Sequence, residues 1–414
     1  MQWPDLRHFF GSLRVPPASY PSVISGLLLI CAANFTWTLS SAVSRRGRLM
    51  RLAIAPAAFF CFFEFGYKSW GVELNRLTTV GINVVSLYGM MQTFSLCIVG
   101  LVDQSSPHWV DLRTGESITI PDSLLWRIIF ALDLTTSLRG TSWLAGRNFN
   151  WCTSGVRKLQ QQMPTRRIFL RNAFFTLIAQ YLIVDFFDTL NKRRHWPTHT
   201  MHPVTSLPWA EQLMSAFSVC MGTINAIIIE HTLMAAIFIA LGSPIEGWPP
   251  MFYSPFSAMS LQDLWTRRWH SIFRRSFDRL SIPLLALLPA KWNAPARPFV
   301  AFWLSAMLHL LIMDRLETTE QFVHPSFADS SILKFFVAQP FALIIEHICI
   351  KPLASKFLPE RWQIVPMRLW AWASMLYTGR YWADVWVRRG LWGPEEKVVP
   401  FSVVRGLWKG EWYV

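Results

Sequence analysis

The sequence is poor in charged side chains. Only 15% of its 414 residues are Asp, Glu, Lys or Arg, whereas 52% are hydrophobic. A soluble globular protein carries about 25% charged residues. Long apolar runs recur from one end of the chain to the other, so no separate water-soluble domain can be delimited. The composition therefore excludes an ordinary soluble protein and predicts one polytopic membrane domain over residues 1–414.

Paired cysteines are also missing. The six cysteines are scattered and none forms a Cys-x-x-Cys pair, so neither a disulfide framework nor a zinc site is indicated. One histidine cluster, His195, His199 and His202, is similar to the histidine boxes of membrane desaturases and hydroxylases. Pro197 and Pro203 break the helix that would place these histidines on one face, and no second cluster follows. We therefore expect no metal.

Acidic residues are few compared with basic ones. The chain has 25 Asp and Glu against 39 Lys and Arg, a net charge of +14 at pH 7. In a soluble protein this excess would suggest nucleic acid as a partner. Here the basic residues cluster beside apolar runs, at 45–48, 166–167, 192–194, 267–268 and 388–389. Such clusters are typical of anchoring at a membrane surface. We expect the lipid bilayer as partner and no nucleic acid.

The apolar runs are the main feature that the chain does contain. A hydrocarbon layer of about 30 Å requires a helix of about 20 residues. Eight runs reach or approach this length: 22–43, 52–66, 79–102, 168–190, 213–242, 297–316, 331–354 and 366–387. Weaker runs lie at 124–136 and 280–290. The sequence thus predicts an all-α fold with about eight transmembrane helices.

One histidine lies inside such a run. His309 is the one ionisable side chain between residues 299 and 313, and the flanking charges are Arg297 and Asp314. At about 1.5 Å per residue, His309 lies about 18 Å along a helix from Arg297. An ionisable group at this depth is costly, and it usually faces a polar cavity and marks a functional path.

A second feature precedes this run. Three prolines and a glycine between Ser243 and Pro250 forbid a continuous helix there. After them, Ser260 and Asp263 form a capping box in which Asp replaces Glu. Helical spacing then places apolar and polar residues on opposite faces: Leu261, Leu264, Trp265, Trp269, Ile272 and Phe273 against Asp263, Arg267, His270 and Arg274. This pattern predicts an amphipathic helix that lies in the membrane surface.

The two histidines suggest a chemistry. We expect His270 and His309 to converge on a cavity open to the cytosol. A neutral imidazole can take a proton from an alcohol that attacks an acyl carbon, and burial keeps an imidazole neutral. A hydrogen bond between helices for His309, and an ordinary interfacial role for His270, are the alternative interpretations.

These residues carry a family resemblance. The segment from Ser260 to His270, Ser-Leu-Gln-Asp-Leu-Trp-Thr-Arg-Arg-Trp-His, resembles a motif of plant wax synthases and their fungal relatives, which belong with the membrane-bound O-acyltransferases. The lead-in 249–256 and the helix with His309 suit the same family. Arg139-Gly-Thr-Ser-Trp143 is similar to a segment of fungal members. The specific motifs place the catalytic core at 243–315. Leu264 and Thr266 stand where Phe and Gly are common, and we interpret both as minor packing changes.

The resemblance implies transfer of an acyl group from coenzyme A to a hydroxyl, with acyl-CoA as co-substrate and no bound cofactor. The intramembrane histidine of the family corresponds to His309, the expected base. His270 stands where relatives have Asn or His, so its role is open. The expected substrate-binding residues are Asp263, Trp265, Arg267, Arg268 and Trp269. Either arginine could bind coenzyme A phosphates as a fork or anchor the chain to anionic headgroups.

The identity of the acceptor alcohol depends on fewer residues than the rest of the implied reaction. The motif that ends in histidine and the segment after Arg139 both look fungal, which favours transfer of acetyl from acetyl-CoA to a terpenoid or meroterpenoid hydroxyl in secondary metabolism. We expect the endoplasmic reticulum membrane as the location. One alternative is a long-chain acyl-CoA:fatty alcohol wax ester synthase. A second is a transporter that relays protons through Glu230–His231 or Glu346–His347, two acid–histidine pairs within apolar runs.

Overall fold

The computed structural model describes residues 15–39, 42–68, 76–111, 114–150, 164–193, 203–316, 329–390 and 398–413. Helices account for most of these residues, which confirms the all-α prediction. The longer α-helices are α2 (Tyr20–Phe35), α3 (Arg45–Tyr67), α4 (Arg76–Thr93), α5 (Leu124–Thr136), α6 (Arg166–Arg193), α7 (Trp209–Ala240), α9 (Arg274–Ala286), α10 (Ala290–Asp314), α11 (Ser330–Ile345) and α13 (Ile364–Arg388).

Short elements connect these helices. The short α-helices are α8 (Leu261–Asp263), α12 (Lys351–Phe357) and α14 (Val403–Lys409). In the described chain, three π-helical turns each continue an α-helix, namely α4, α8 and α11: η3 (Phe94–Ile98), η8 (Leu264–Arg268) and η9 (Glu346–Ile350). The described strands form one small antiparallel sheet in the order β2-β1-β3, from β1 (Trp109–Val110), β2 (Ser117–Ile118) and β3 (Asn148–Phe149).

Seven helical segments of the described chain are long and apolar enough to cross a membrane: Pro17–Thr38, Arg45–Tyr67, Arg76–Leu101, Arg166–Lys192, Trp209–Ala240, Ala290–Asp314 and Ser330–Phe357. They correspond to seven of the eight predicted spans. The eighth run forms α13, which has 25 residues but contains Arg368, Arg380 and Asp384. The weaker run 124–136 forms α5, whose 13 residues are too few to span a bilayer.

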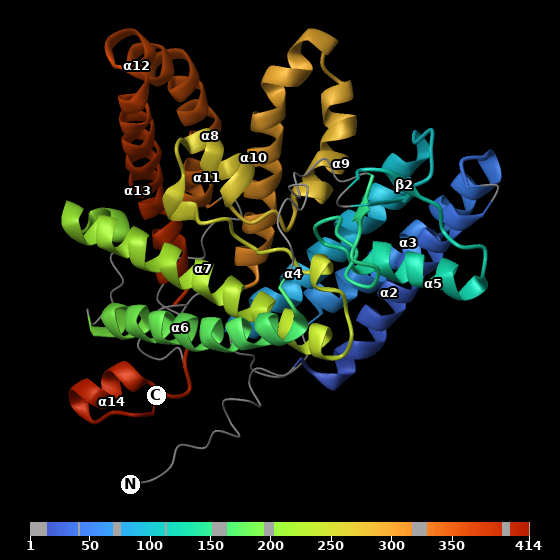
Figure 1. The fold of residues 1–414 in the computed structure, drawn as a ribbon, viewed down its shortest axis with the longest axis horizontal. Coiled ribbons are helices and arrows are strands. Elements are labelled where there is room, and N and C mark those ends of the chain that lie inside the picture. Colours follow the sequence, from blue (N-terminus) through green and yellow to red (C-terminus); the bar gives the residue numbers. More distant parts are fainter. Residues whose placement is uncertain are drawn as a thin grey trace.

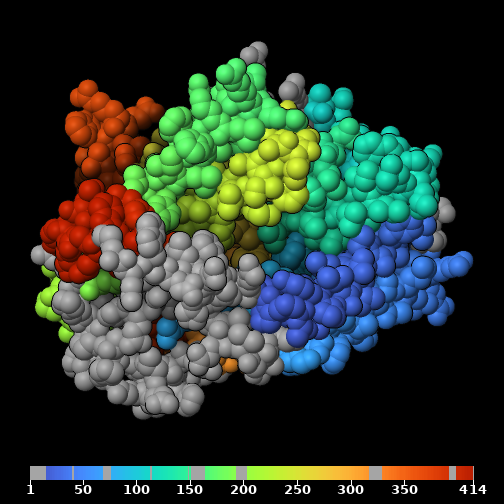
Figure 2. Space-filling view, turned by 90° about the horizontal axis from the view of Figure 1, so that it is seen from below, coloured from blue at the N-terminus to red at the C-terminus, as the bar shows by residue number. Residues whose placement is uncertain are grey.

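Figure 1 shows how these helices are arranged. The α9–α10 hairpin and the α11–α12–α13 hairpin rise at the top of the view, with α8 between them. α6 and α7 lie side by side below them. α2, α3 and α5 lie together on the right of the view, across the molecule from α13. The view from below places the N-terminal helices (blue) and α14 (red) at opposite ends of the molecule (Figure 2).

The largest hydrophobic cluster lies where α10, α11 and α13 meet. It includes Ala306 and Leu310 of α10, Phe336 of α11 and Val385 of α13. Leu308 of α10 packs in a separate cluster with Leu87 of α4. His309 therefore lies on a helix that is held by packing on two sides.

Polar and ionic contacts join the start of α11 to the C-terminal ends of α10 and α13. Asp329 caps α11 by accepting from the N–H of Ser331, and it pairs with Arg388 and Arg389 at the end of α13. Arg389 also donates its Nε to the carbonyl of Met313 at 2.9 Å. The same carbonyl accepts from the N–H of Leu316 at 3.2 Å, so the end of α10 is held both by the following turn and by Arg389.

The C-terminal helix α14 docks against α6 in the same manner. Ser402 caps α14 and donates its Oγ to Asp185 at 2.5 Å. Arg405 of α14 pairs with Asp188 of α6 at 3.2 Å. Charges buried in pairs of this kind hold two elements in register, since removal of one partner would leave the other charge buried and uncompensated.

Candidate functional site

The predicted helix start at Ser260 is present. Ser260 Oγ accepts a hydrogen bond from the N–H of Asp263 at 2.9 Å, and the carboxylate of Asp263 accepts from the N–H of Met259 at 3.1 Å. Each of these side chains thus satisfies a backbone donor that the helix itself leaves free. The capping box forms, with the acid returning to Met259 rather than to Ser260 itself.

A third acceptor at this helix start was not predicted. The carboxylate of Glu346, in the π-helical turn after α11, accepts from the N–H of Leu261 at 2.6 Å and of Gln262 at 3.0 Å. An acidic group at a helix N-terminus also interacts favourably with the helix dipole. The sequence signal is limited to a carboxylate inside an apolar run, which the transporter alternative uses as part of a proton relay.

The prediction of one amphipathic helix that continues to Arg274 is wrong. The helical segment ends at Arg268, because Trp269 is extended, with ψ 155°. The N–H of Tyr253 donates to the carbonyl of Arg268 at 3.1 Å, so the proline-rich segment pairs with the chain at this point. α9 then begins separately at Arg274. Tertiary pairing here overrides the helical periodicity of the sequence.

The apolar face of this short helix is covered by protein. Leu261 and Leu264 are fully buried in a cluster with Ala342 of α11 and Ala371 of α13. The predicted apolar face therefore exists over residues 261–265, and it packs against two helices instead of being left for lipid.

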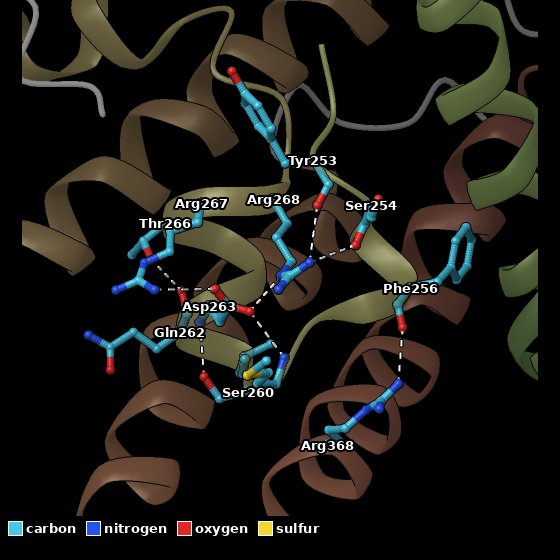
Figure 3. Close-up of polar contacts among 12 residues, drawn as sticks. Tyr253, Ser254, Phe256, Ser260, Gln262, Asp263, Thr266, Arg267, Arg268 and Arg368 are labelled. Carbon is cyan, nitrogen blue, oxygen red and sulfur yellow. Dashed lines mark hydrogen bonds and ion pairs between the residues drawn. The ribbon is translucent and has the colours of Figure 1, made fainter. Parts of the chain in front are cut away.

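Asp263 forms two ion pairs of unequal quality (Figure 3). The pair with Arg267, four positions later, has an N–O distance of 4.0 Å, whereas Arg268 donates its Nε to Asp263 at 2.5 Å. Burial alone would raise the pKa of the Asp263 carboxyl, but the Arg268 guanidinium, the N–H of Met259 and the Arg267 charge together lower it.

The two adjacent arginines consequently differ in what they can do. Arg268 donates its Nη1 to the carbonyls of Tyr253 and Ser254, both at 3.2 Å, so its guanidinium is engaged within the protein (Figure 3). It supports Ser254, whose φ of 49° is unusual for a residue other than glycine. The side chain of Arg267 is 69% exposed. Of the two, Arg267 is the one positioned to meet an external phosphate.

The predicted substrate-binding tryptophans line the inner side of this segment. Trp265 donates its Nε1 to Gln339 of α11 at 3.1 Å and contacts Phe302 of α10 edge-on. Trp269 contacts Trp265 and Phe252, again edge-on. These rings fill the space between the motif segment and the helix that carries His309.

His270 lies within the protein and not on an outer polar face with Arg267. Its ring contacts Phe252 and Trp269, with centroids 5.7 and 5.5 Å away, and its buried Nδ1 has no hydrogen-bond partner among the described residues. Burial, the nearby His309 and the charge of Arg139 lower the pKa of His270 to about 3. His270 is therefore a neutral imidazole at physiological pH.

His309 has a hydrogen bond that defines its tautomer. Its Nδ1 lies 2.7 Å from the carbonyl oxygen of Ser305, one turn earlier in α10. Because a carbonyl can only accept, Nδ1 carries the proton, and Nε2 of the neutral ring keeps its lone pair. The ring stacks on Phe336 at 4.7 Å and meets Trp382 edge-on at 5.0 Å. The imidazole is thus oriented by one polar contact and two aromatic ones.

The structure brings both histidines into one neighbourhood. His309 lies close enough to His270 to help lower its pKa, although 39 positions separate them in the chain. Both histidines are partly buried residues. An oriented base beside a second neutral imidazole can deprotonate a hydroxyl and hydrogen-bond a neighbouring polar group.

The segment after Arg139 is part of the same neighbourhood. Arg139 donates to Ser271, next to His270, at 2.9 Å. Ser243 donates its Oγ to the carbonyl of Trp143 at 2.5 Å, and Trp248 donates its Nε1 to Ser243 at 2.9 Å. The resemblance had indicated this segment from the sequence without showing what it contacts.

The other chemical candidates lie apart from the two histidines or outside the described residues. Glu346, one of the two acid–histidine pairs considered for a proton relay, accepts hydrogen bonds from the start of α8. The cluster His195, His199 and His202 falls outside the described residues. Across the described chain, no group of three or more His, Cys, Asp or Glu side chains could hold a metal ion.

A cavity of about 320 Å³ lies elsewhere. Its walls include Trp37, His108, Ser117, Asp122 and Arg127. These residues belong to the flank of α2, α5 and the small sheet, and neither His270 nor His309 is among the residues that line it. It contributes nothing to the site described above.

Known proteins share this sequence pattern. Residues 248–336 match the membrane bound O-acyl transferase family, a range that contains both histidines. The chain is 25% identical to acetyltransferase ple2 of Rhodocybe pseudopiperita over 300 residues, which cover 70% of this chain and 74% of that protein. It is 22% identical to acetyltransferase eriL of Hericium erinaceus over 383 residues, which cover 90% and 93%. It is 29% identical to acetyltransferase atnC of an Arthrinium species over 232 residues, which cover 49% and 51%.

Proposed function

We propose that the chain is an acyl-CoA-dependent membrane O-acyltransferase that transfers acetyl from acetyl-CoA to a hydroxyl of an apolar acceptor, a proposal supported by its similarity to the membrane bound O-acyl transferase family and to the acetyltransferases named above. We propose a terpenoid or meroterpenoid alcohol of secondary metabolism as the acceptor, and the endoplasmic reticulum membrane as the location. The reacting groups belong to the segment 243–315 within one polytopic domain.

The observation that carries the proposal is the contact between His309 Nδ1 and the carbonyl oxygen of Ser305. The Nδ1–H of His309 is committed to this carbonyl, so Nε2 is the nitrogen available to accept a proton. In the proposed step, Nε2 takes the proton of the acceptor hydroxyl while the oxygen attacks the thioester carbon. The carbon–sulfur bond breaks, the ester forms, and the proton passes to the coenzyme A thiolate. Atoms and charge balance without a further reactant.

His270 has a different part in this proposal. Its neutral ring, whose Nδ1 has no partner in the part of the chain that the structure describes, hydrogen-bonds a reactant beside His309 and orients it. A bound reactant placed in this way reacts faster, because the cost of orienting it is met on binding. We assign proton transfer to His309 and orientation to His270.

The choice of acetyl rests on the relatives. Acetyltransferase ple2 and acetyltransferase eriL carry acetyl transfer in their names. The packed indole rings of Trp265 and Trp269, close to His270, are compatible with a short acyl group.

The test is an assay of membranes that contain the full chain. Acetyl-CoA or palmitoyl-CoA is supplied with a panel of alcohols that includes geraniol, farnesol and 1-dodecanol, and release of coenzyme A thiol is recorded. We expect thiol release with acetyl-CoA only when an alcohol is present. Faster release with palmitoyl-CoA and 1-dodecanol would identify a wax ester synthase instead. Uptake of an alcohol or cation into vesicles with no thiol release from either donor would contradict acyl transfer altogether.

A further inference from the structure

We infer that Arg139 is a positioning residue that holds the loop with His270 in place from both sides. The inference rests on the proposed function, since it assigns Arg139 to the orientation of His270. Arg139 itself comes from a turn between α5 and β3, and 131 positions separate it from His270 in the sequence.

The hydrogen bonds of Arg139 reach two separate segments. Its Nε donates to Ser271 Oγ at 2.9 Å, directly after His270. Its Nη1 donates to the carbonyl of Pro249 at 2.7 Å, and its Nη2 to the carbonyl of Pro250 at 3.0 Å. Phe252, two residues after Pro250, contacts the His270 ring. One guanidinium therefore joins the two segments that enclose the imidazole.

The turn that presents Arg139 is rigid for identifiable reasons. Gly140 has a φ of 74°, a left-handed conformation that glycine adopts without strain. Ser137 donates its Oγ to the carbonyl of Thr141 at 2.8 Å, and the N–H of Phe149 donates to the carbonyl of Gly140 at 2.9 Å. From the other side, the buried Arg275 of α9 donates to the carbonyl of Ser137 at 3.3 Å. The Arg139 side chain thus starts from a fixed backbone.

The chemistry of the contacts requires an arginine. A guanidinium offers five N–H donors in a planar fork, whereas a lysine ammonium is a single point of charge on a flexible stem. Three acceptors in three directions are within reach of the fork only. Arg139 is 9% exposed, so loss of its side chain would leave two proline carbonyls without these donors.

Arg139 matters for His270 because that ring has few anchors of its own. Its Nδ1 makes no hydrogen bond to any described residue, and the orientation of the ring depends on the backbone of 269–271 and on the packing of Phe252. His309, by contrast, is oriented directly by Ser305. Displacement of the loop would move His270 and leave His309 in place.

The experiment uses the full chain in membranes and two independent readouts. Arg139→Ala and Arg139→Lys are compared with Arg147→Ala, a matched control in the same segment whose guanidinium lies over Trp109. The first readout is acetyl transfer to the alcohol that the wild type uses fastest. The second is modification of each histidine by diethyl pyrocarbonate, read by mass spectrometry, which needs no acceptor.

We expect Arg139→Ala to lower kcat about 100-fold, as displacement of a reactive group by about 1 Å does, with little change in the KM for acetyl-CoA. The modification rate of His270 should rise while that of His309 stays as in the wild type. Arg139→Lys should lie between Arg139→Ala and the wild type in both readouts. Arg147→Ala should match the wild type.

Two results would overturn the inference. Arg139→Ala could match Arg147→Ala in both readouts, which would mean that the loop holds without the guanidinium. Alternatively, all histidines could become more reactive together, which would mean that Arg139 stabilises the whole fold and does not act on His270. If the wild type transfers no acetyl to any alcohol, the proposed function fails, while histidine modification still decides the role of Arg139.

Discussion

Arg268 donates its Nε to the carboxylate of Asp263 at 2.5 Å, and the same guanidinium reaches the carbonyl of Tyr253 at 3.2 Å. The short helix that begins at Leu261 is thereby tied to the proline-rich segment before it (Figure 3). The neighbouring Arg267 projects outward. The two consecutive arginines therefore differ in their contacts. Arg268 makes hydrogen bonds within the protein, whereas the side chain of Arg267 is exposed.

This difference predicts distinct effects of two adjacent substitutions. Arg268→Ala should lower the free energy of unfolding by about 1–3 kcal/mol, since Asp263 loses a charged hydrogen-bond donor. Arg267→Ala should change it by less than about 0.5 kcal/mol, because an exposed pair contributes little, and should raise the KM for acetyl-CoA. Thermal unfolding and acetyl-CoA titration of both variants measure this. Equal loss of stability in the two variants would contradict the assignment.

The contact of Glu346 with the start of α8 gives a second prediction. Glu346→Ala removes the acceptor of the Leu261 and Gln262 N–H groups. A buried donor without a partner costs about 1–3 kcal/mol, so the melting temperature should fall clearly. The matched control is Glu360→Ala, at the exposed start of η10 (Glu360–Trp362), where we expect almost no change. A stable Glu346→Ala variant would show that the helix start is held by Ser260 alone.

The sequence predicts the long helices of this fold better than it predicts where short helices end and what the connecting segments contact. Long apolar runs gave seven spans at nearly their observed positions, because span length follows directly from bilayer thickness. The capping residue Ser260 was predictable because its effect is local. The end of that helix at Arg268 was not, since it depends on pairing with Tyr253. Contacts between distant segments leave little trace in a local pattern.

The same holds for the candidate site: features that depend on local sequence could be predicted, and contacts between distant segments could not. His309 could be identified because an ionisable residue is conspicuous within an apolar run, and its tautomer became evident only from the Ser305 carbonyl. The inward position of His270 contradicts the face that helical spacing gave it. The partners of Arg139 and Glu346 could not be predicted, because each lies about 85 or more positions away in the chain.

A third prediction concerns the close approach at Gly247. A Cβ atom there would lie 2.7 Å from the Trp143 Cα and 2.8 Å from the Ser142 carbonyl oxygen. Because both are backbone atoms, Gly247→Ala should push the two segments apart and cost about 1–3 kcal/mol, with reduced transfer activity. Gly81→Ala in α4 is the control, since a Cβ there meets no atom within 4 Å. Thermal unfolding of both variants measures this difference. Equal melting temperatures would show that Gly247 is not in close contact with the backbone of Ser142 and Trp143.

A fourth prediction follows from the lowered pKa of His270. Between its ordinary value of 6.5 and about 3, the unfolded chain binds a proton at this ring and the folded chain does not. The free energy of unfolding therefore falls as the pH falls through this window and is unaffected above it. The groups that act on the His270 ring are His309 of α10 and Arg139, which lies in the turn between α5 and β3.

The measurement compares the wild type with His270→Asn in detergent between about pH 7.5 and about pH 5. The melting temperature of the wild type should decline more steeply on acidification than that of the variant. Identical slopes would mean that His270 is protonated in the folded protein.

The most direct test of the account is acetyl transfer by His309→Ala. If Nε2 of His309 takes the proton of the acceptor hydroxyl, kcat should fall by about 100-fold to about 10,000-fold, the usual contribution of a general base. The variant should remain in the membrane and keep its melting temperature within a few degrees. Thiol release from acetyl-CoA in the presence of the accepted alcohol, at matched protein amounts, is the quantity to record. Release at the wild-type rate would contradict the role of His309, and loss of release to the level seen without alcohol is the predicted result.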